Sequence, residues 1–515
     1  MNGRRREFLA DVGRGMLVAS LGATASLELG IVGGFADEPT KRLTFGKLEP
    51  LVALMQETPP DRLMPLLAER LAAGAELKTL VCAGALANAR AFGGQDYTGF
   101  HTFMALAPAL QIADELPIDR RPLPVMKVLY RNSSRIQDQA ADHHDVLQPV
   151  DVASGAAPGA DELRASIRAI DWNLAENQFA RLSNDSVADA FNQLQVAVQD
   201  EPDVHRVVLS WRAWVMLGLA GPEYAQTLLR QSVRYCLDTE QRMRDKNYPH
   251  SGVRELLPRL LDEHRLLAKP LGNRPVDDQW VERLAREIFA GTQEQAATAV
   301  AAAIAEGIDP EAIGQALSLA ANMLVLHDPG RRPEQTAAGK PAGCVHGDSP
   351  GVHASDAANA WRNIARVANP RNRVASYIVG AYHTGGQMRY VSKDHFPYAE
   401  KLEELDDVTN GVALLAETER AIQANDQALA CALVDRYSQL ELPAAPIFDL
   451  MRKYAVSEDG ALHAEKYFRT VTEEYAATRP AFRARQLVAL ARVTASEYGY
   501  PAPGYQQACE LLRIS

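Results

Sequence analysis

An alanine-rich helical segment that occurs twice is the feature that most constrains how this chain can fold. Residues 71–89 (LAAGAELKTLVCAGALANA) align with residues 304–322 (IAEGIDPEAIGQALSLAAN) at an offset of 233 residues. Each copy reads as the end of one helix, a turn at Gly74 or Gly307, and a second helix rich in small residues. Self-similarity at a fixed offset is typical of a repeated supersecondary unit. The pattern therefore predicts two copies of one helical unit.

Chemically distinctive residues farther along the chain repeat in the same order. The repeated pairs, at offsets of 252, 241 and 258 residues, are His101 with His353, Glu176 with Glu417, and His205 with His463. A single pair of this kind arises easily by chance, whereas an ordered series with slowly drifting offsets favours duplication. We therefore expect two pseudo-equivalent units, at residues 44–270 and 271–515, with a linker around residues 269–275.

The chain beyond residue 44 has helical periodicity throughout. Apolar residues recur with a period near that of a helix, Pro, Gly and Asp separate the runs, and no stretch alternates β-branched and polar residues. Helices are expected at residues 61–73, 77–91, 100–116, 223–243, 310–326 and 461–477. The prediction is an all-α fold, either a duplicated helical-hairpin bundle or a short α-solenoid. Residues 327–349 are expected to form a long ordered flap or a mobile lid.

Length and composition are those of a globular protein. The 515 residues are 47% hydrophobic and 23% charged, which is enough apolar material for a large core. The net charge of -11 argues against unspecific binding to nucleic acid, because phosphate contacts need a basic surface. The five scattered cysteines make a poor disulfide framework. The body has no run of about 18 apolar residues, so no membrane span is expected in the mature chain.

The first 36 residues resemble a twin-arginine export signal. The matching residues are Arg5, Arg6, Phe8 and Leu9. A moderately apolar stretch follows at residues 16–22, and small residues allow cleavage after Ala25 or after Ala36. The resemblance implies that the twin-arginine translocation machinery exports the protein to the periplasm or another extracytoplasmic location. This route accepts folded cargo, often loaded with a metal or redox cofactor; an amphipathic first helix is the alternative interpretation.

The histidines carry the chemical prediction, because no common catalytic motif is present. The sequence has no phosphate-binding glycine loop, no GxSxG elbow, no HExxH and no Cys/His zinc ribbon. Two histidines and a carboxylate per unit match the ligand sets of non-haem iron or zinc, since they leave open positions on a divalent ion. The predicted ligands are His101, His205 and Glu176 in the first unit and His353, Asp356, Glu417 and His463 in the second.

Two of these predictions depend on helical spacing. Asp356 follows His353 by three residues and so shares its helical face, whereas the first unit has Met104 at the equivalent place. Arg212 follows His205 by two turns and is predicted to bind an anionic or planar ligand or cofactor. The alternatives are structural: the histidines cap helix ends, and the stem of Arg212 covers apolar surface.

Two short segments resemble questin-oxidase-like proteins. Residues 346–353 read His-Gly-Asp-Ser-Pro-Gly-Val-His and lead into an Ala/Asn/Trp-Arg helix at residues 354–362, and a second similarity spans residues 459–467. Proteins of this family are helical, histidine-bearing oxidoreductases of aromatic polyketide metabolism. The resemblance implies an oxygenase-type pocket in which His353 and His463 are catalytic residues that contact substrate or cofactor.

Together these features predict an exported, metal-dependent or questin-oxidase-like oxidoreductase that acts on a small molecule. A second hypothesis is a non-catalytic helical binding or scaffold protein. It is supported by the helical repeat and by the lack of a strong catalytic motif. A third is a helical hydrolase or lyase that uses histidine and glutamate as acid and base. The sequence does not name the substrate, and it leaves the cofactor open beyond a divalent metal.

Overall fold

The computed structural model of the chain describes residues 42–139, 145–150 and 158–514. The predicted export signal at residues 1–36 lies outside this range. Within it the chain forms 23 α-helices and five 3₁₀-helices, with isolated β-bridges and no β-strand. The prediction of an all-α protein is therefore confirmed. None of the described helices combines the length and the apolar character that crossing a bilayer requires.

The helices fall into two consecutive series. Those of the first half are η1 (Gly46–Leu48), α2 (Glu49–Glu57), α3 (Pro60–Ala72), α4 (Leu77–Phe92), α5 (Tyr97–Asp114), α6 (Pro122–Asp138), α7 (Ala160–Arg168), α8 (Trp172–Asp185), α9 (Val187–Val198), α10 (Val204–Ala220), η2 (Pro222–Tyr224), α11 (Ala225–Asp245) and α12 (Val253–Glu263). Those of the second half are α13 (Asp278–Ala290), α14 (Gln293–Ala305), α15 (Pro310–His327), η3 (Pro333–Gln335), α16 (Pro350–Val367), α17 (Pro370–Thr384), η4 (Gln387–Tyr390), α18 (Ala399–Glu403), α19 (Gly411–Gln423), α20 (Gln427–Gln439), α21 (Ala445–Ser457), η5 (Gly460–Leu462), α22 (Ala464–Ala477), α23 (Pro480–Glu497) and α24 (Tyr505–Leu512).

Capping side chains decide where the central helices begin. Asp96, Asp203 and Ser349 each accept a hydrogen bond from a backbone N–H of the first turn of α5, α10 and α16. This is why α5 begins at Tyr97, three residues before the predicted start. Helix α22 begins three residues later than predicted, because Ala461 and Leu462 adopt positive φ angles of 49° and 74° that no helix continues.

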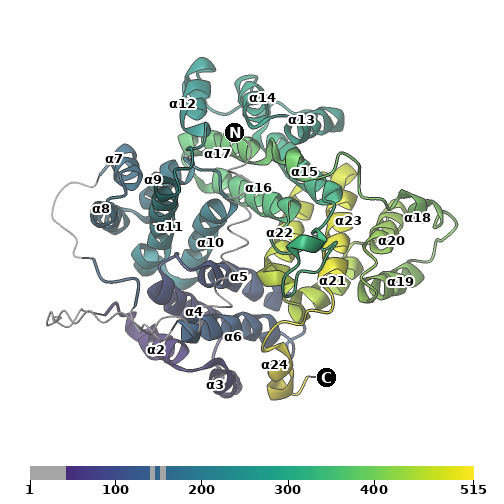
Figure 1. Cartoon of the computed structure of the whole chain (residues 1–515), viewed down its shortest axis with the longest axis horizontal. Helices are drawn as coiled ribbons and strands as arrows, with labels where there is room; N and C mark the ends of the chain where they lie inside the picture. The colour runs from purple at the N-terminus through teal and green to yellow at the C-terminus, as the bar shows by residue number, and fades with distance from the viewer. Residues whose placement is uncertain (1–41, 140–144, 151–157, 515) are drawn as a thin grey trace.

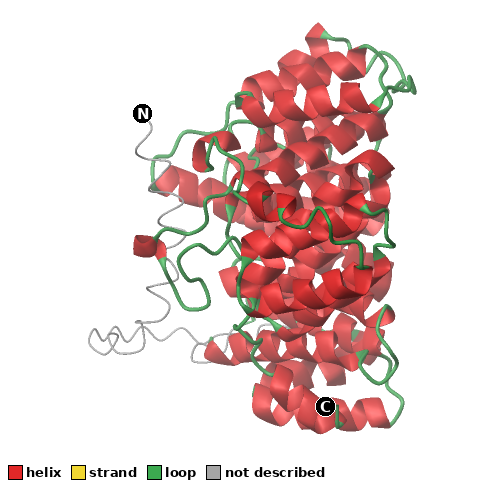
Figure 2. Cartoon of the chain, turned by 90° about the vertical axis from the view of Figure 1, so that its right-hand side faces the viewer, coloured by secondary structure: helices red, strands yellow, loops and turns green. Residues whose placement is uncertain are grey.

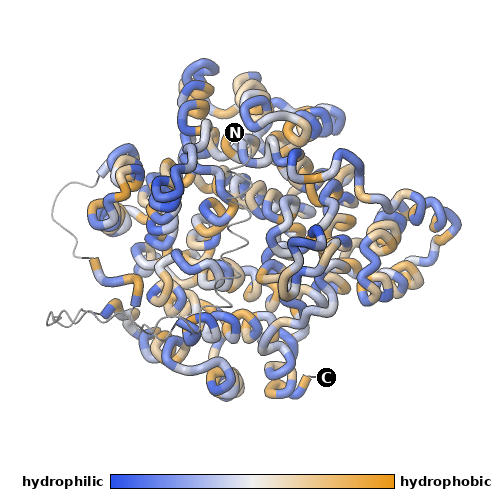
Figure 3. Tube along the Cα trace, in the orientation of Figure 1, coloured by the Kyte–Doolittle hydropathy of each residue, from blue (hydrophilic) through white to orange (hydrophobic). Residues whose placement is uncertain are grey.

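Four of these helices occupy the middle of the molecule. Helix α5 contacts α10 and α22, and α16 contacts the same two helices, so the four form a closed ring of neighbours (Figure 1). The remaining helices pack around them in stacked layers, as the side view shows (Figure 2). Apolar positions gather between the helices while hydrophilic positions predominate on the outside (Figure 3). Fully buried Trp361, Phe103 and Phe179 belong to this core.

Candidate functional site

The four central helices bring the four predicted histidines together. His101 lies in the second turn of α5, His205 and His353 in the first turns of α10 and α16, and His463 at the N-cap of α22. Their ring centroids are 4.8 Å apart for His101–His205, 5.3 Å for His205–His353, 5.2 Å for His353–His463 and 5.1 Å for His463–His101. We call this set the four-histidine centre.

The outer ring nitrogens of His101 and His463 are held by backbone carbonyls, and that of His205 lies near a carboxylate. His101 Nδ1 donates to the carbonyl of Tyr97 at 2.7 Å, and His463 Nδ1 donates to the carbonyl of Ala461 at 2.8 Å. His205 Nδ1 lies 3.8 Å from a carboxylate oxygen of Asp203. A carbonyl or carboxylate on one nitrogen fixes the tautomer and leaves the other nitrogen as a lone-pair donor, the arrangement typical of metal-binding histidines.

The inner nitrogens face one another with few partners. His353 Nε2 and His463 Nε2 share a hydrogen bond of 3.2 Å. Nε2 of His101 and Nε2 of His205 are buried and have no hydrogen-bond partner among the described residues. A buried polar atom without a partner costs about 1–3 kcal/mol, so such atoms mark a place where something else is bound.

Burial favours the neutral form of three of the four rings. It lowers the pKa of His353 to about 3 and holds the pKa values of His101 and His463 well below the usual histidine range, with the nearby charge of Lys466 acting in the same direction. Neutral imidazole is the form that binds metal. Part of the His353 surface is exposed, whereas the other three rings are buried, so the centre opens on the His353 side.

The spacing of the rings fits a shared ion, although the donor atoms are not yet arranged as a formed site. Two nitrogens on one tetrahedral zinc are about 3.3 Å apart, close to the 3.2 Å between His353 Nε2 and His463 Nε2. No set of three or more His, Cys, Asp or Glu side chains in the described part of the chain already has the geometry of a metal site.

A layer of charged side chains lies one or two helical turns beyond the histidines. Asp356 follows His353 on α16, Lys466 follows His463 on α22, and Arg212 follows His205 on α10. All three are buried, and Asp356 accepts a hydrogen bond of 2.7 Å from Thr470 Oγ1. Burial raises the pKa of Asp356 and lowers the pKa of Lys466 to about 7. Neither Asp356 oxygen bonds a histidine of the centre.

The segment between α15 and α16 covers the open side of the centre. Its Asp348 forms ion pairs with Arg331 and with Lys340, the latter at 3.1 Å, and the Asp348 charge acts on His353. The segment is anchored to α23, because Ser496 Oγ accepts from the Val345 N–H at 2.8 Å and bonds His346 Nδ1 at 2.8 Å. The predicted flap at residues 327–349 is thus tied down in this structure.

The two glutamates predicted as metal ligands make their contacts elsewhere. Glu176 on α8 pairs with Arg234 and lies 3.6 Å from Arg230. Glu417 on α19 is on the surface, where it pairs with Arg420. The helical period predicts which face of a helix each glutamate occupies but not what packs against that face. Both carboxylates pair with arginines, so neither is assigned to the four-histidine centre.

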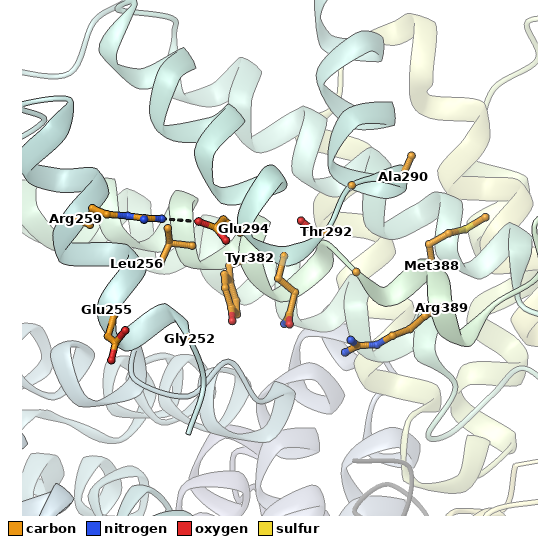
Figure 4. A pocket seen from close by; sticks show the side chains of 13 residues that line it. Gly252, Glu255, Leu256, Arg259, Ala290, Thr292, Glu294, Tyr382, Met388 and Arg389 are labelled. Carbon is orange, nitrogen blue, oxygen red and sulfur yellow. Dashed lines mark hydrogen bonds and ion pairs between the residues drawn. The ribbon is translucent and has the colours of Figure 1, made fainter. Parts of the chain in front are cut away.

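A surface pocket of about 880 Å³ lies apart from the four-histidine centre (Figure 4). It is lined by α12, the start of α14 and the η4 segment, with Tyr382 of α17 in its wall. Arg259 and Glu294 form an ion pair of 2.5 Å within it. None of the four histidines lines this pocket, and its charged groups are already paired in part, so we do not assign the chemistry to it.

Several residues around the centre were not singled out by the sequence. Lys466 and Asp203 are visible only as neighbours of duplicated histidines, three residues after His463 and two before His205. Tyr97 packs its ring 4.2 Å from His101 by centroid. Asp348 reaches the centre through the flap, and no spacing pattern in the sequence connects it with His353.

No family model, no curated protein and no solved structure matches this chain. The similarity of two short segments to questin-oxidase-like proteins therefore stays a prediction, as does the export signal.

Proposed function

We propose that this chain is an exported all-α oxidoreductase whose four-histidine centre holds one divalent metal ion, iron or zinc. The observation that carries the proposal is the convergence of His101, His205, His353 and His463 from four helices, with two Nε2 atoms buried and unpartnered. Four imidazoles in one buried layer are costly to assemble unless they bind something, because each neutral ring leaves a lone pair to satisfy.

The oxidoreductase class has separate support. His353 and His463 lie in the two segments that resemble questin-oxidase-like proteins, and these segments, far apart in the sequence, meet at 3.2 Å. Four neutral nitrogens leave the positive charge of a divalent ion uncompensated, which favours binding of an anion beside it. The partly exposed His353 gives such a molecule a way in from the flap side.

The surrounding residues would hold the centre in a binding form. The carbonyls of Tyr97 and Ala461 fix the tautomers of His101 and His463, and the carboxylate of Asp203 supports His205. The buried Lys466 opposes protonation of the rings. Asp356, a predicted ligand, bonds Thr470 instead of a histidine, and we assign it no bond to the ion.

Metal analysis of the purified protein tests the proposal. We expect about one iron or zinc ion per chain and a fall in melting temperature when a chelator removes it, because an ion bound only by the folded state stabilises that state. The proposal is wrong if the protein contains no ion after refolding with iron or zinc and a chelator leaves its melting temperature unchanged. That result would favour the non-catalytic scaffold hypothesis.

We also infer that the two halves are duplicates, related by exchange of α5 with α16 and of α10 with α22. What supports this is the pairing of contacts: the α5–α22 contact corresponds to α16–α10, and the 5.1 Å His101–His463 separation corresponds to 5.3 Å for His353–His205. Superposition of residues 44–270 on residues 271–515 should place His101 on His353 and His205 on His463. A best superposition that pairs these histidines with other residues would exclude duplication.

A further inference from the structure

Arg212 is the one buried arginine whose guanidinium has no partner in the described part of the chain. Seven arginines there are buried: Arg90, Arg131, Arg206, Arg212, Arg230, Arg362 and Arg492. Six of them donate hydrogen bonds to carboxylates, amides or backbone carbonyls. Arg212 is 3% exposed, and its Nε and Nη1 have no hydrogen-bond partner. A buried cation in this position is unfavourable unless an anion joins it.

The nearest carboxylates are occupied by other donors. Asp356 and Glu473 both act electrostatically on Arg212. Asp356 accepts from Thr470, and Glu473 accepts from Asn359 at 3.1 Å and from Arg469 at 2.8 Å. Because neither carboxylate hydrogen-bonds to Arg212, the guanidinium fork remains free to bind a planar anion through two parallel N–H bonds.

The position of Arg212 directs it at the four-histidine centre. It follows His205 by seven residues on α10, about 10 Å along the helix axis and on the same face. Helical side chains lean toward the N-terminus of their helix, so the long arginine stem reaches back toward His205. The Arg212 charge also acts on Asp356 and on Lys466, which each follow a histidine of the centre by three residues.

We propose that Arg212 binds the carboxylate of an organic substrate whose opposite end reaches the four-histidine centre. This inference deepens the proposed function and rests on it for the role of the centre, but the binding of the carboxylate itself needs no metal. Because the oxygens of Asp356 and Glu473 are bonded to other donors, a substrate carboxylate is the ligand that can pair with the guanidinium of Arg212. A neutral molecule of the same shape would leave the guanidinium unpaired.

Benzoate and benzamide are matched probes, because they share a planar ring and differ in charge. We expect benzoate to raise the melting temperature of the wild-type protein more than benzamide does, with and without chelator. In Arg212→Met the benzoate-specific shift should disappear and the benzoate Kd should weaken about tenfold or more. Arg212→Lys, which keeps the charge without the fork, should keep part of the shift.

The stability of the unliganded variants separates a binding role from a structural one. Arg212→Met should melt at or above the wild-type temperature, since it removes an unpaired buried charge. Arg206→Met on the same helix, which loses bonds to Glu240 and to the Ala197 carbonyl, should melt several degrees lower.

Three outcomes would each overturn the proposal: equal responses to benzoate and benzamide, a benzoate shift that persists in Arg212→Met, or a large loss of stability in Arg212→Met. The metal content of Arg212→Met should equal that of the wild type. The metal content of the wild-type protein therefore tests the proposed function, and the benzoate response tests the role of Arg212.

Discussion

Each histidine of the four-histidine centre contributes a nitrogen and very little packing beyond its ring. His353→Ala and His101→Ala are therefore both expected to remove the bound ion while changing the melting temperature of the metal-free protein by only a few degrees. His101 has Met104 three residues on, where His353 has Asp356, yet each ring has a histidine neighbour at a similar centroid distance. The separation is 4.8 Å for His101–His205 and 5.2 Å for His353–His463. Metal content by elemental analysis and thermal unfolding are the measurements.

His395→Ala is the matched control, because His395 is an exposed histidine outside the centre. It should keep the full metal content. If His353→Ala unfolds the protein and the wild type also contains no metal, the histidine is a structural cap of α16 and the proposed function is wrong.

Acid should destabilise the metal-free protein through the same rings. In the folded chain the pKa of His353 is lowered to about 3, and the pKa values of His101 and His463 are also well below the usual histidine range. In the unfolded chain histidine protonates near pH 6.5. Below pH 6.5 the unfolded state therefore binds more protons, and stability falls as the pH drops from 6.5 toward 3. Each ring contributes a slope of up to about 1.4 kcal/mol per pH unit.

Urea unfolding of chelator-treated protein between about pH 7 and about pH 5 measures this slope. His353→Gln should reduce this slope, because it removes one histidine whose pKa is lowered in the folded state. A wild-type stability that is flat over this range, or equal slopes in wild type and His353→Gln, would show that the rings do not control the acid response.

At the scale of single elements, the flap between α15 and α16 depends on its anchor to α23. Ser496→Ala removes the acceptor of the Val345 N–H and the partner of His346 Nδ1, both buried. We expect a loss of about 1–3 kcal/mol of unfolding free energy and faster proteolysis within residues 328–349. Limited proteolysis followed by mass spectrometry locates the cleavage.

A serine whose hydroxyl bonds only within its own helix supplies the comparison. Ser438 Oγ donates to the Val434 carbonyl of α20, and Ser438→Ala should leave both stability and the proteolysis pattern as in the wild type. Cleavage of Ser496→Ala at the same sites and rate as the wild type would mean that Ser496 does not anchor the flap.

At the scale of the whole molecule, a buried ion cluster joins the two halves. Lys127 and Arg131 of α6 contact Glu465 of α22 at 3.1 Å and 3.0 Å. Glu465→Gln leaves two buried cations with weakened partners, and we expect it to cost about 3–5 kcal/mol of unfolding free energy. Glu417→Gln, which breaks an exposed pair with Arg420, should change neither the melting temperature nor the metal content. Equal stability of Glu465→Gln and wild type would show that the cluster does not hold the halves together.

The proposed export belongs to the same scale, since it concerns the whole folded cargo. Replacing Arg5 and Arg6 by lysine should keep the protein in the cytoplasm, because the twin-arginine machinery reads that pair. Fractionation of cells that express wild type and variant is the measurement. A variant that still leaves the cytoplasm in full would show that residues 1–36 are not a twin-arginine signal.

The helices were predictable because their signals are local. Periodicity and punctuation predicted residues 77–91 and 310–326, which the structure extends by one residue each to Leu77–Phe92 and Pro310–His327. The largest errors, of three residues, occurred at the starts of helices. Asp96 begins α5 earlier than its apolar run suggests, and the positive φ of Ala461 delays α22, because caps and left-handed residues act at single positions.

The repeat in the sequence was enough to single out all four histidines, but not to bring them together. The spacing predicted that His101 corresponds to His353 and His205 to His463, and this correspondence stays a prediction. Only the ring of contacts among α5, α10, α16 and α22 decided that the four rings meet in one layer, and that Glu176 and Glu417 take part in other ion pairs. Helical period fixes which face of a helix a residue occupies, whereas the partner of that face depends on packing between segments hundreds of residues apart. For the same reason Arg212 was visible as a candidate from its two-turn spacing, and only the tertiary structure shows that its guanidinium is buried without a partner.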